Sequence, residues 1–162
     1  MSRHPLEQRV VDHLELLGAS YEVFEIDPDF ADTAAFCERY GYSLDESANA
    51  ILIASRRPLD VFGICLALAT TRLDVNHKVR SLLDVRKLSF ATAEQTVAVT
   101  GMEIGGVTPF GLIEPPPIYV DGAIMDLGRA IVGGGTRGMK VTVDPEVFGR
   151  MEGVQVVEGL AG

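Results

Sequence analysis

The sequence predicts an α/β fold: one domain over residues 1–162, with a mixed β-sheet and short helices packed around it. Short apolar runs bounded by turn residues alternate with segments of helical spacing, which indicates strands and helices in one fold. The chain is 47% hydrophobic and 23% charged, as ordinary globular proteins are. Its 162 residues are enough for one core without disulfides or metals. The sequence has no internal repeat or linker that would divide it.

The first half begins with an expected helix over residues 5–17, because Leu6, Val10 and Leu14 follow helical spacing and Gly18 is suited to end it. A second, short helix is expected from a cap at Asp32 to Tyr40, closed by Gly41. Apolar or alternating runs bounded by turn residues predict strands over residues 21–26, 48–54 and 61–69.

The second half begins with an expected helix from Asp74 to about Leu83. A capping box at Thr92–Gln95 predicts another helix to about Val99. Asp144 and Pro145 are suited to start a last helix, which we expect to reach Met151. Strands are expected over residues 87–90, 118–120, 140–143 and 154–157. The remaining segments, residues 101–117 and 133–135, are rich in Gly or Pro and predict irregular backbone.

Charge and targeting signals place the protein in the cytoplasm and argue against DNA and membrane partners. The net charge is -9, and no apolar run approaches the ~20 residues of a membrane span. Residues 1–5 lack the apolar stretch of a signal peptide. The middle of the chain differs, since residues 51–100 hold 7 basic and 4 acidic side chains. Such a face is suited to a transient contact with an RNA end, because a long duplex needs more phosphate contacts.

Several kinds of site chemistry are absent from the sequence. Three histidines are scattered without metal-ligand spacing, so we expect no metal and no cofactor. There is neither a G-x-S-x-G nucleophile elbow nor a phosphate-binding P-loop. We interpret Cys37 and Cys65 as buried, unreactive thiols and His77 as a surface residue.

The backbone of the run from Gly105 to Pro109 is the remaining candidate for a site that binds or polarises a substrate. Glycine allows a ligand to approach the main chain closely, and proline fixes the far end of the loop. Such a loop can direct successive N–H groups at a carbonyl or a developing oxyanion. From the residues alone, a plain surface turn is the alternative interpretation.

The segment from Thr100 to Leu112 resembles the T-G-x-x-x-G-G-V/I-x-P-x-G signature of the YbaK/prolyl-tRNA synthetase-associated editing domains. Further matches occur in the same order over residues 20–145. They are Asp32-Thr33 with Gly41, Leu73-Asp74 with Lys78, Pro117 to Asp121, and Gly133-Gly134 with Arg137-Gly138.

The resemblance implies a trans-editing hydrolase that cleaves the ester between a mischarged amino acid and the terminal adenosine of tRNA. No metal is used, and a hydroxyl of the terminal ribose helps to activate water. The resemblance implies that Gly105 and Gly106 supply oxyanion donors. It places Thr108 and Pro109 at the amino-acid pocket, and Thr33 and Phe30 near the adenosine or the pocket wall. Expected substrate contacts also include Val107, Gly133 and Gly134.

Two positions depart from the family pattern. The family usually has a Lys where this chain has Asn49, and an Asn offers only neutral hydrogen bonds, which are weaker than charge-assisted ones. Many members have an acidic residue where this chain has Lys140. We therefore predict a catalytic role for Asn49 and substrate contact by Lys140. In this hypothesis the positive charge that the family has at position 49 lies instead on the other side of the pocket, at Lys140. The alternative for Asn49 is a structural bond to a neighbouring loop.

Three functions remain open from the sequence. The first is an aminoacyl-tRNA deacylase that contacts the acceptor end of aminoacyl-tRNA, with an aminoacyl-tRNA synthetase as a further partner. The second is a relative that binds aminoacyl-tRNA, an aminoacyl-like ligand or a synthetase without hydrolysis, which the absence of Lys at Asn49 favours. The third is a hydrolase of a small ester, which the acidic net charge favours. We expect a monomer or a small homo-oligomer.

Overall fold

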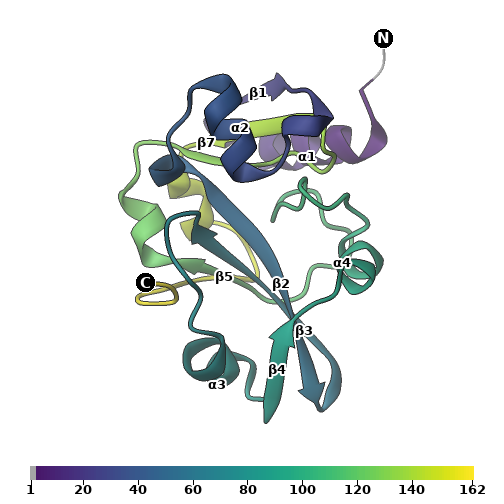
Figure 1. Cartoon of the computed structure of the whole chain (residues 1–162), viewed down its shortest axis with the longest axis vertical. Helices are drawn as coiled ribbons and strands as arrows, with labels where there is room; N and C mark the ends of the chain where they lie inside the picture. Colours follow the sequence, from purple (N-terminus) through teal and green to yellow (C-terminus); the bar gives the residue numbers. More distant parts are fainter. Residues whose placement is uncertain (1–2) are drawn as a thin grey trace.

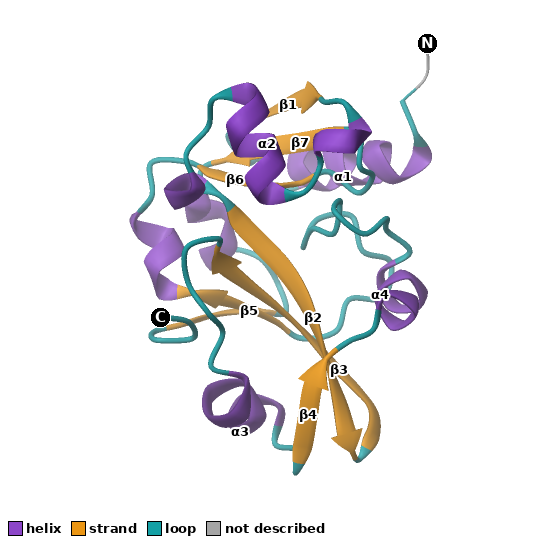
Figure 2. Cartoon of the chain, in the orientation of Figure 1, coloured by secondary structure: helices purple, strands orange, loops and turns teal. Residues whose placement is uncertain are grey.

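A computed structural model describes residues 3–162, so the first two residues of the domain expected over 1–162 lie outside the described part. Its strands divide into two sheets (Figure 2). The smaller sheet is antiparallel, in the order β1 (Tyr21–Glu25), β7 (Met139–Val143) and β6 (Ala130–Gly133). The predicted α/β class is confirmed, with the strands in two sheets.

The larger sheet is mixed. Its order is β4 (Lys87–Phe90), β2 (Ala48–Arg57), β3 (Leu59–Leu68), β5 (Ile118–Asp121) and β8 (Val154–Val157). The pairs β4–β2 and β2–β3 are antiparallel, and β3–β5 and β5–β8 are parallel. β4 is therefore an edge strand that pairs only with the second half of β2.

Four α-helices occur in the described residues. They are α1 (Pro5–Leu16), α2 (Thr33–Tyr40), α3 (Arg80–Leu83) and α4 (Ala93–Thr100). Shorter helical turns cover η1 (Pro28–Phe30), η2 (Leu44–Glu46), η3 (Val75–Val79), η4 (Gly122–Asp126) and η5 (Pro145–Gly149). Figure 1 shows α1 and α2 beside the smaller sheet and α3 beside β4 in the larger one. Within residues 3–162, no helix has the length and apolar character to cross a membrane.

The main core lies between the two sheets and α1. Val10 of α1, Ile64 of β3 and Val141 of β7 belong to one cluster of fully buried side chains. The segment from Gly101 to Leu112 after α4 is called the glycine-rich loop. Its Phe110 stacks against Phe148 in the same cluster, with ring centroids 5.7 Å apart. The loop is thus anchored in the core on its far side, which fixes it relative to both sheets.

Local signals for helix ends are largely confirmed. Thr92 and Gln95 form the capping box of α4, and Gly41 ends α2 with a φ of 76°. Asp32 stands at the N-cap of α2 but makes no capping hydrogen bond there. Its carboxylate instead accepts a hydrogen bond from Arg137, so the prediction of a side-chain cap was wrong.

Other element boundaries differ from the predicted ones, mainly where strands pair with segments that are distant in sequence. β2 continues past the expected end to Arg57, because a register shift lets it keep pairing with both neighbours. The strand β6 was not predicted, since Ala130–Gly133 is a short run that forms a strand only through β7. The expected helix from Pro145 is a short 3-10 turn that ends at Gly149.

Candidate functional site

A cavity of about 400 Å³ opens between the start of α2, the first half of β2, strand β6 and the glycine-rich loop. Its volume is within the usual range for small-ligand sites. The sequence-predicted residues that line it are Thr33, Asn49, Gly105, Val107, Gly133 and Lys140. These six come from five separate segments of the chain, so the fold gathers most of the predicted site at one place.

Other predicted residues do not line the cavity. Gly106, Thr108, Pro109 and Gly134 are buried behind it. Phe30 lies at a shallower depression beside Ala35 and Arg39, with its ring 5.6 Å from the Arg39 guanidinium carbon. Direct substrate contact by these five residues is therefore not supported by their positions.

The glycine-rich loop is held by backbone bonds to the second glycine segment. The N–H of Gly135 donates to the carbonyl of Gly106 over 2.7 Å, and the N–H of Glu103 donates to Gly135 over 3.1 Å. A Cβ on Gly133 would lie 2.5 Å from the carbonyl oxygen of Val107. The two segments therefore require glycine for close backbone packing.

The N–H groups of the loop are not equally free. The N–H of Gly106 donates to the carbonyl of Glu103 over 2.9 Å, so it is occupied within a turn. For Gly105 and Val107, no backbone acceptor meets the N–H within residues 3–162. The expectation of Gly106 as an oxyanion donor is therefore revised. The loop residues that line the cavity and whose N–H groups meet no backbone acceptor among residues 3–162 are Ile104, Gly105 and Val107.

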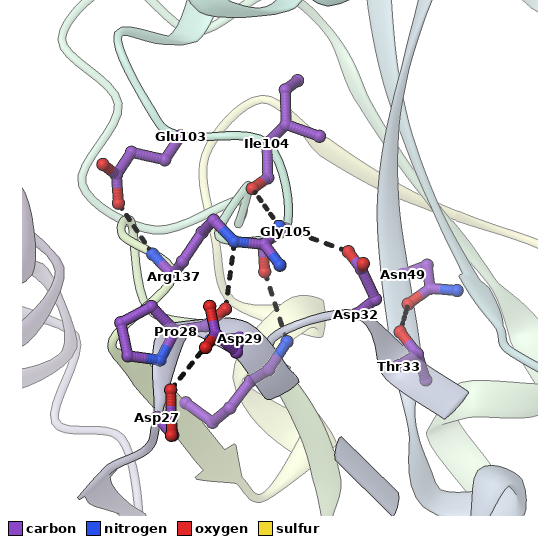
Figure 3. Close-up of polar contacts among 11 residues, drawn as sticks. Asp27, Pro28, Asp29, Asp32, Thr33, Asn49, Glu103, Ile104, Gly105 and Arg137 are labelled. Atoms are coloured by element: carbon purple, nitrogen blue, oxygen red, sulfur yellow. Dashed lines mark hydrogen bonds and ion pairs between the residues drawn. The ribbon is translucent and has the colours of Figure 1, made fainter. Parts of the chain in front are cut away.

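Arg137 ties the loop to the start of α2 (Figure 3). Its Nη1 donates to the carbonyl of Ile104 over 3.0 Å and to the carboxylate of Asp32 over 3.3 Å. Its Nε donates to the carbonyl of Pro28 over 3.1 Å. The sequence match to the family included Arg137-Gly138, but only the fold reveals that this Arg joins three segments around the cavity.

Lys140 projects from β7 into the cavity wall. Its amino group donates to the carbonyl of Gly105 over 3.3 Å and lies 5.6 Å from the centre of the Phe36 ring. Only 7% of the residue is exposed, and this burial lowers its pKa from 10.5 to about 8, against the opposing effect of Asp32. An ammonium group has three donors, so those not used by Gly105 are available to a ligand.

Asn49 faces α2 from the first half of β2. Its side-chain oxygen accepts a hydrogen bond from the hydroxyl of Thr33 over 2.6 Å (Figure 3). In this assignment the Asn49 amide N–H groups have no side-chain partner among residues 3–162. Asn49 thus has a structural bond and free donors at the cavity. Lys140 lines the same cavity, so the two departures from the family pattern do meet there.

Several other side chains are accounted for by the fold. Cys65 is fully buried, so the prediction of a buried thiol is confirmed, and burial raises its pKa to about 12. Cys37 is also buried and free, and the His77 side chain is 82% exposed. The hydroxyl of Thr108 is buried without a hydrogen-bond partner among the described residues.

Comparison with known proteins decides the family. The family description "Aminoacyl-tRNA editing domain" matches residues 27–150, more than half of the chain. The chain belongs to this family. The match includes the glycine-rich loop, Arg137 and Lys140, so the cavity lies within the editing-domain region.

Two further comparisons show what the chain is similar to. The uncharacterized protein YwhH of Bacillus subtilis (strain 168) is 26% identical over 134 residues, which is 83% of each chain. A solved structure described as a "putative trans-editing enzyme for prolyl tRNA synthetase" matches with a TM-score of 0.79 at 24% identity, over 97% of this chain and 98% of that one.

A second solved structure, of the hypothetical protein APE2540, matches with a TM-score of 0.84 at 18% identity. It covers 95% of this editing-domain chain and 99% of its own. At such identities the two structures show that the fold is shared.

Proposed function

We propose that the protein is an aminoacyl-tRNA deacylase that hydrolyses the ester of a mischarged tRNA in trans. The observation that carries this proposal is the cavity where the backbone of the glycine-rich loop meets a buried Lys140. Membership of the editing-domain family supports an aminoacyl-tRNA substrate. The match to a structure described as a "putative trans-editing enzyme for prolyl tRNA synthetase" supports hydrolysis in trans.

In the proposed complex the ester carbonyl lies against the loop, where the N–H groups of Gly105 and Val107 stabilise the developing negative charge. Gly106 positions this segment through its bond to Glu103. The donors of Lys140 that Gly105 does not use bind an oxygen of the substrate. The ribose hydroxyl of the terminal adenosine helps to orient the attacking water.

Asn49 favours a second candidate function, in which the protein binds aminoacyl-tRNA, an aminoacyl-like ligand or a synthetase without hydrolysis. Its neutral amide replaces the positive charge that most family members place there, and its oxygen is already bound to Thr33. Under this alternative the cavity still binds its ligand, but position 49 lacks the positive charge that the reaction needs.

A panel of charged tRNAs tests the two functions with the wild type and the Asn49→Lys variant. We expect the wild type to release at least one amino acid, and the variant to change the released set or tighten tRNA binding, since it adds a charge to the cavity. Release is measured for each amino acid, and binding is measured with uncharged tRNA.

Retained binding with no release of any amino acid would support the second function instead. An unchanged profile in the variant would assign Asn49 a structural role only.

A further inference from the structure

The outer end of the larger sheet has a group of four exposed basic side chains, which we call the basic tip: Arg56, Arg57, Arg86 and Lys87. Arg57 ends β2 and stands opposite Lys87 of β4, and the N–H of Arg86 donates to the carbonyl of Arg57 over 2.9 Å. The basic tip is at the lower end of Figure 1, where β4 begins beside the turn between β2 and β3.

The charges of the basic tip are not neutralised by ion pairs. None of the ion pairs within residues 3–162 includes one of the four side chains. The side-chain partner of Arg56 is neutral, since its Nε donates to the hydroxyl of Ser89 over 2.9 Å. Like charges directly opposite each other on neighbouring strands are destabilising. A basic tip on a protein with a net charge of -9 therefore indicates a surface for a negatively charged partner.

Phe90 lies at the other end of the same strand. Its side chain is 58% exposed, although Phe is usually buried, and it lines the rim of the cavity together with Ala91. Lys87 and Phe90 are three residues apart, which is roughly 10 Å along a strand. The short strand β4 thus connects an exposed aromatic ring at the cavity to the basic tip.

The open edge of β4 forms a continuous surface from Phe90 at the cavity to the basic tip. Alternate residues of a strand point to opposite faces, so Phe90 and Lys87 project from different faces of the sheet. β4 is the outermost strand, however, and a chain that lies along its open edge can contact side chains of both faces. An aromatic ring followed by basic side chains is the combination that binds single-stranded nucleic acid, by stacking and by phosphate contact.

We propose that the single-stranded 3′ end of tRNA lies along the open edge of β4. With the terminal adenosine in the cavity, Phe90 stacks on a neighbouring base, and the basic tip binds the phosphates nearer the acceptor stem. This proposal rests on the proposed function for the identity of the RNA, and it assigns the interactions outside the reacting ester.

The test measures binding of an uncharged acceptor-stem minihelix that ends in CCA, over a range of salt concentrations. The double variant Arg56→Gln/Lys87→Gln removes two positive charges from the basic tip. We expect the slope of the logarithm of the association constant against the logarithm of the salt concentration to fall in magnitude by about 0.7 for each phosphate that the protein no longer binds. Phe90→Ala is expected to weaken binding on the order of tenfold with an unchanged slope, because the variant loses the stacking of one base but no phosphate contact. Phe90→Tyr should bind as the wild type does.

Arg72→Gln is the matched control, because Arg72 is exposed and lies on the chain beside Gly162, outside the cavity and the basic tip. It should leave affinity and slope unchanged. The phosphate-binding role of the basic tip would be overturned if the double variant had the affinity and salt slope of the wild type. It would also be overturned if Arg72→Gln lowered the affinity and slope as much as the double variant does. Equal binding by Phe90→Ala and the wild type would overturn the stacking. Thermal melts of each variant confirm that it is folded.

A separate measurement distinguishes this proposal from the proposed function. Hydrolysis of aminoacyl-adenosine esters by the wild type requires the cavity but no phosphate. If no ester is hydrolysed while the minihelix shows the expected variant effects, the RNA surface stands and the deacylase function fails. If esters are hydrolysed and the minihelix variants all bind equally, the deacylase function stands and the RNA surface fails. Binding of prolyl-tRNA synthetase through the basic tip, without minihelix binding, would also overturn the RNA proposal.

Discussion

At the scale of the single residue, Lys140 is the most informative side chain of the site. It is a buried amine with a carbonyl partner at 3.3 Å and an aromatic ring beside it. Burial disfavours its charged form, and the carboxylate of Asp32 acts in the opposite direction. The charge on Lys140 therefore depends on pH within the working range of an enzyme, which makes its role accessible to experiment.

If the ammonium form of Lys140 binds the substrate oxygen, deacylation should weaken as that charge is removed. The pKa of Lys140 is lowered to about 8, so kcat/KM is expected to fall as the pH rises above about 8. Lys140→Arg should remove this fall, because a guanidinium remains charged. Below about pH 8, Lys140→Met should lower kcat/KM by roughly tenfold or more, the value of a charge-assisted hydrogen bond. Above that pH its difference from the wild type should shrink, because the wild-type amine loses its charge.

Lys78→Met is the control for Lys140→Met, since Lys78 is an exposed Lys on η3. Rates are corrected for the uncatalysed hydrolysis of the ester at each pH. A wild-type profile that stays level from about pH 7 to about pH 9 would contradict the role of the ammonium group.

At the scale of elements, the site depends on the packing of two irregular segments. The glycine-rich loop and the segment Gly133–Gly135 exchange backbone hydrogen bonds without forming a strand pair. Arg137, two residues beyond that segment, donates further bonds to the carbonyls of Ile104 and Pro28. The loop therefore has its N–H groups positioned before a ligand arrives, which is the condition for effective oxyanion stabilisation.

The close approach of these segments predicts the effect of one methyl group. In Gly133→Ala the new Cβ would meet the carbonyl oxygens of Val107 at 2.5 Å and Gly106 at 2.7 Å. Both are backbone atoms, so the loop must move, and we expect a decrease of about 1–3 kcal/mol in the free energy of unfolding. Deacylation should fall with it, because the loop N–H groups are displaced.

Gly149→Ala provides the comparison, since a Cβ at Gly149 meets no atom within 4 Å. Urea unfolding and deacylation are measured for both variants. Wild-type stability and activity in Gly133→Ala would contradict the proposed rigidity of the loop.

At the scale of the whole molecule, the N-terminal helix supports the site from behind. The N–H of Gly111 donates to Nδ1 of His13 over 2.9 Å, and Nε of Arg9 donates to the carbonyl of Gly111 over 3.2 Å. The ring of His13 also contacts the edge of Phe110, with centroids 6.0 Å apart. Residues about one hundred positions apart in sequence thus hold the far end of the glycine-rich loop against α1.

This packing of His13 predicts a pH dependence of stability. Burial lowers the pKa of His13 below its ordinary 6.5, so the folded state favours the neutral ring that accepts from Gly111. Between its folded pKa and 6.5, the unfolded chain binds more protons than the folded one. The contribution of His13 is therefore complete above pH 6.5 and is lost as the pH falls below that value.

His13→Asn keeps an acceptor near the Nδ1 position and does not titrate. The decrease in the free energy of unfolding from about pH 7.5 to about pH 5.5 should be smaller in this variant than in the wild type. His77→Asn is the control, because the His77 side chain is 82% exposed, and it should keep the wild-type decrease. The same decrease in all three proteins would exclude His13 as its source.

The sequence by itself determined the α/β class, most of the helices and strands, and the loop that carries the family. These follow from local signals: apolar periodicity, the capping box at Thr92, and glycine and proline spacing from Gly101 to Gly111. The tertiary structure decided which loop N–H groups remain free, why Lys140 and Asn49 share one cavity, and how Arg137 joins three segments. It also formed β6 and placed Phe90 at the cavity. Each of these depends on contacts between segments far apart in the chain, which local spacing does not encode.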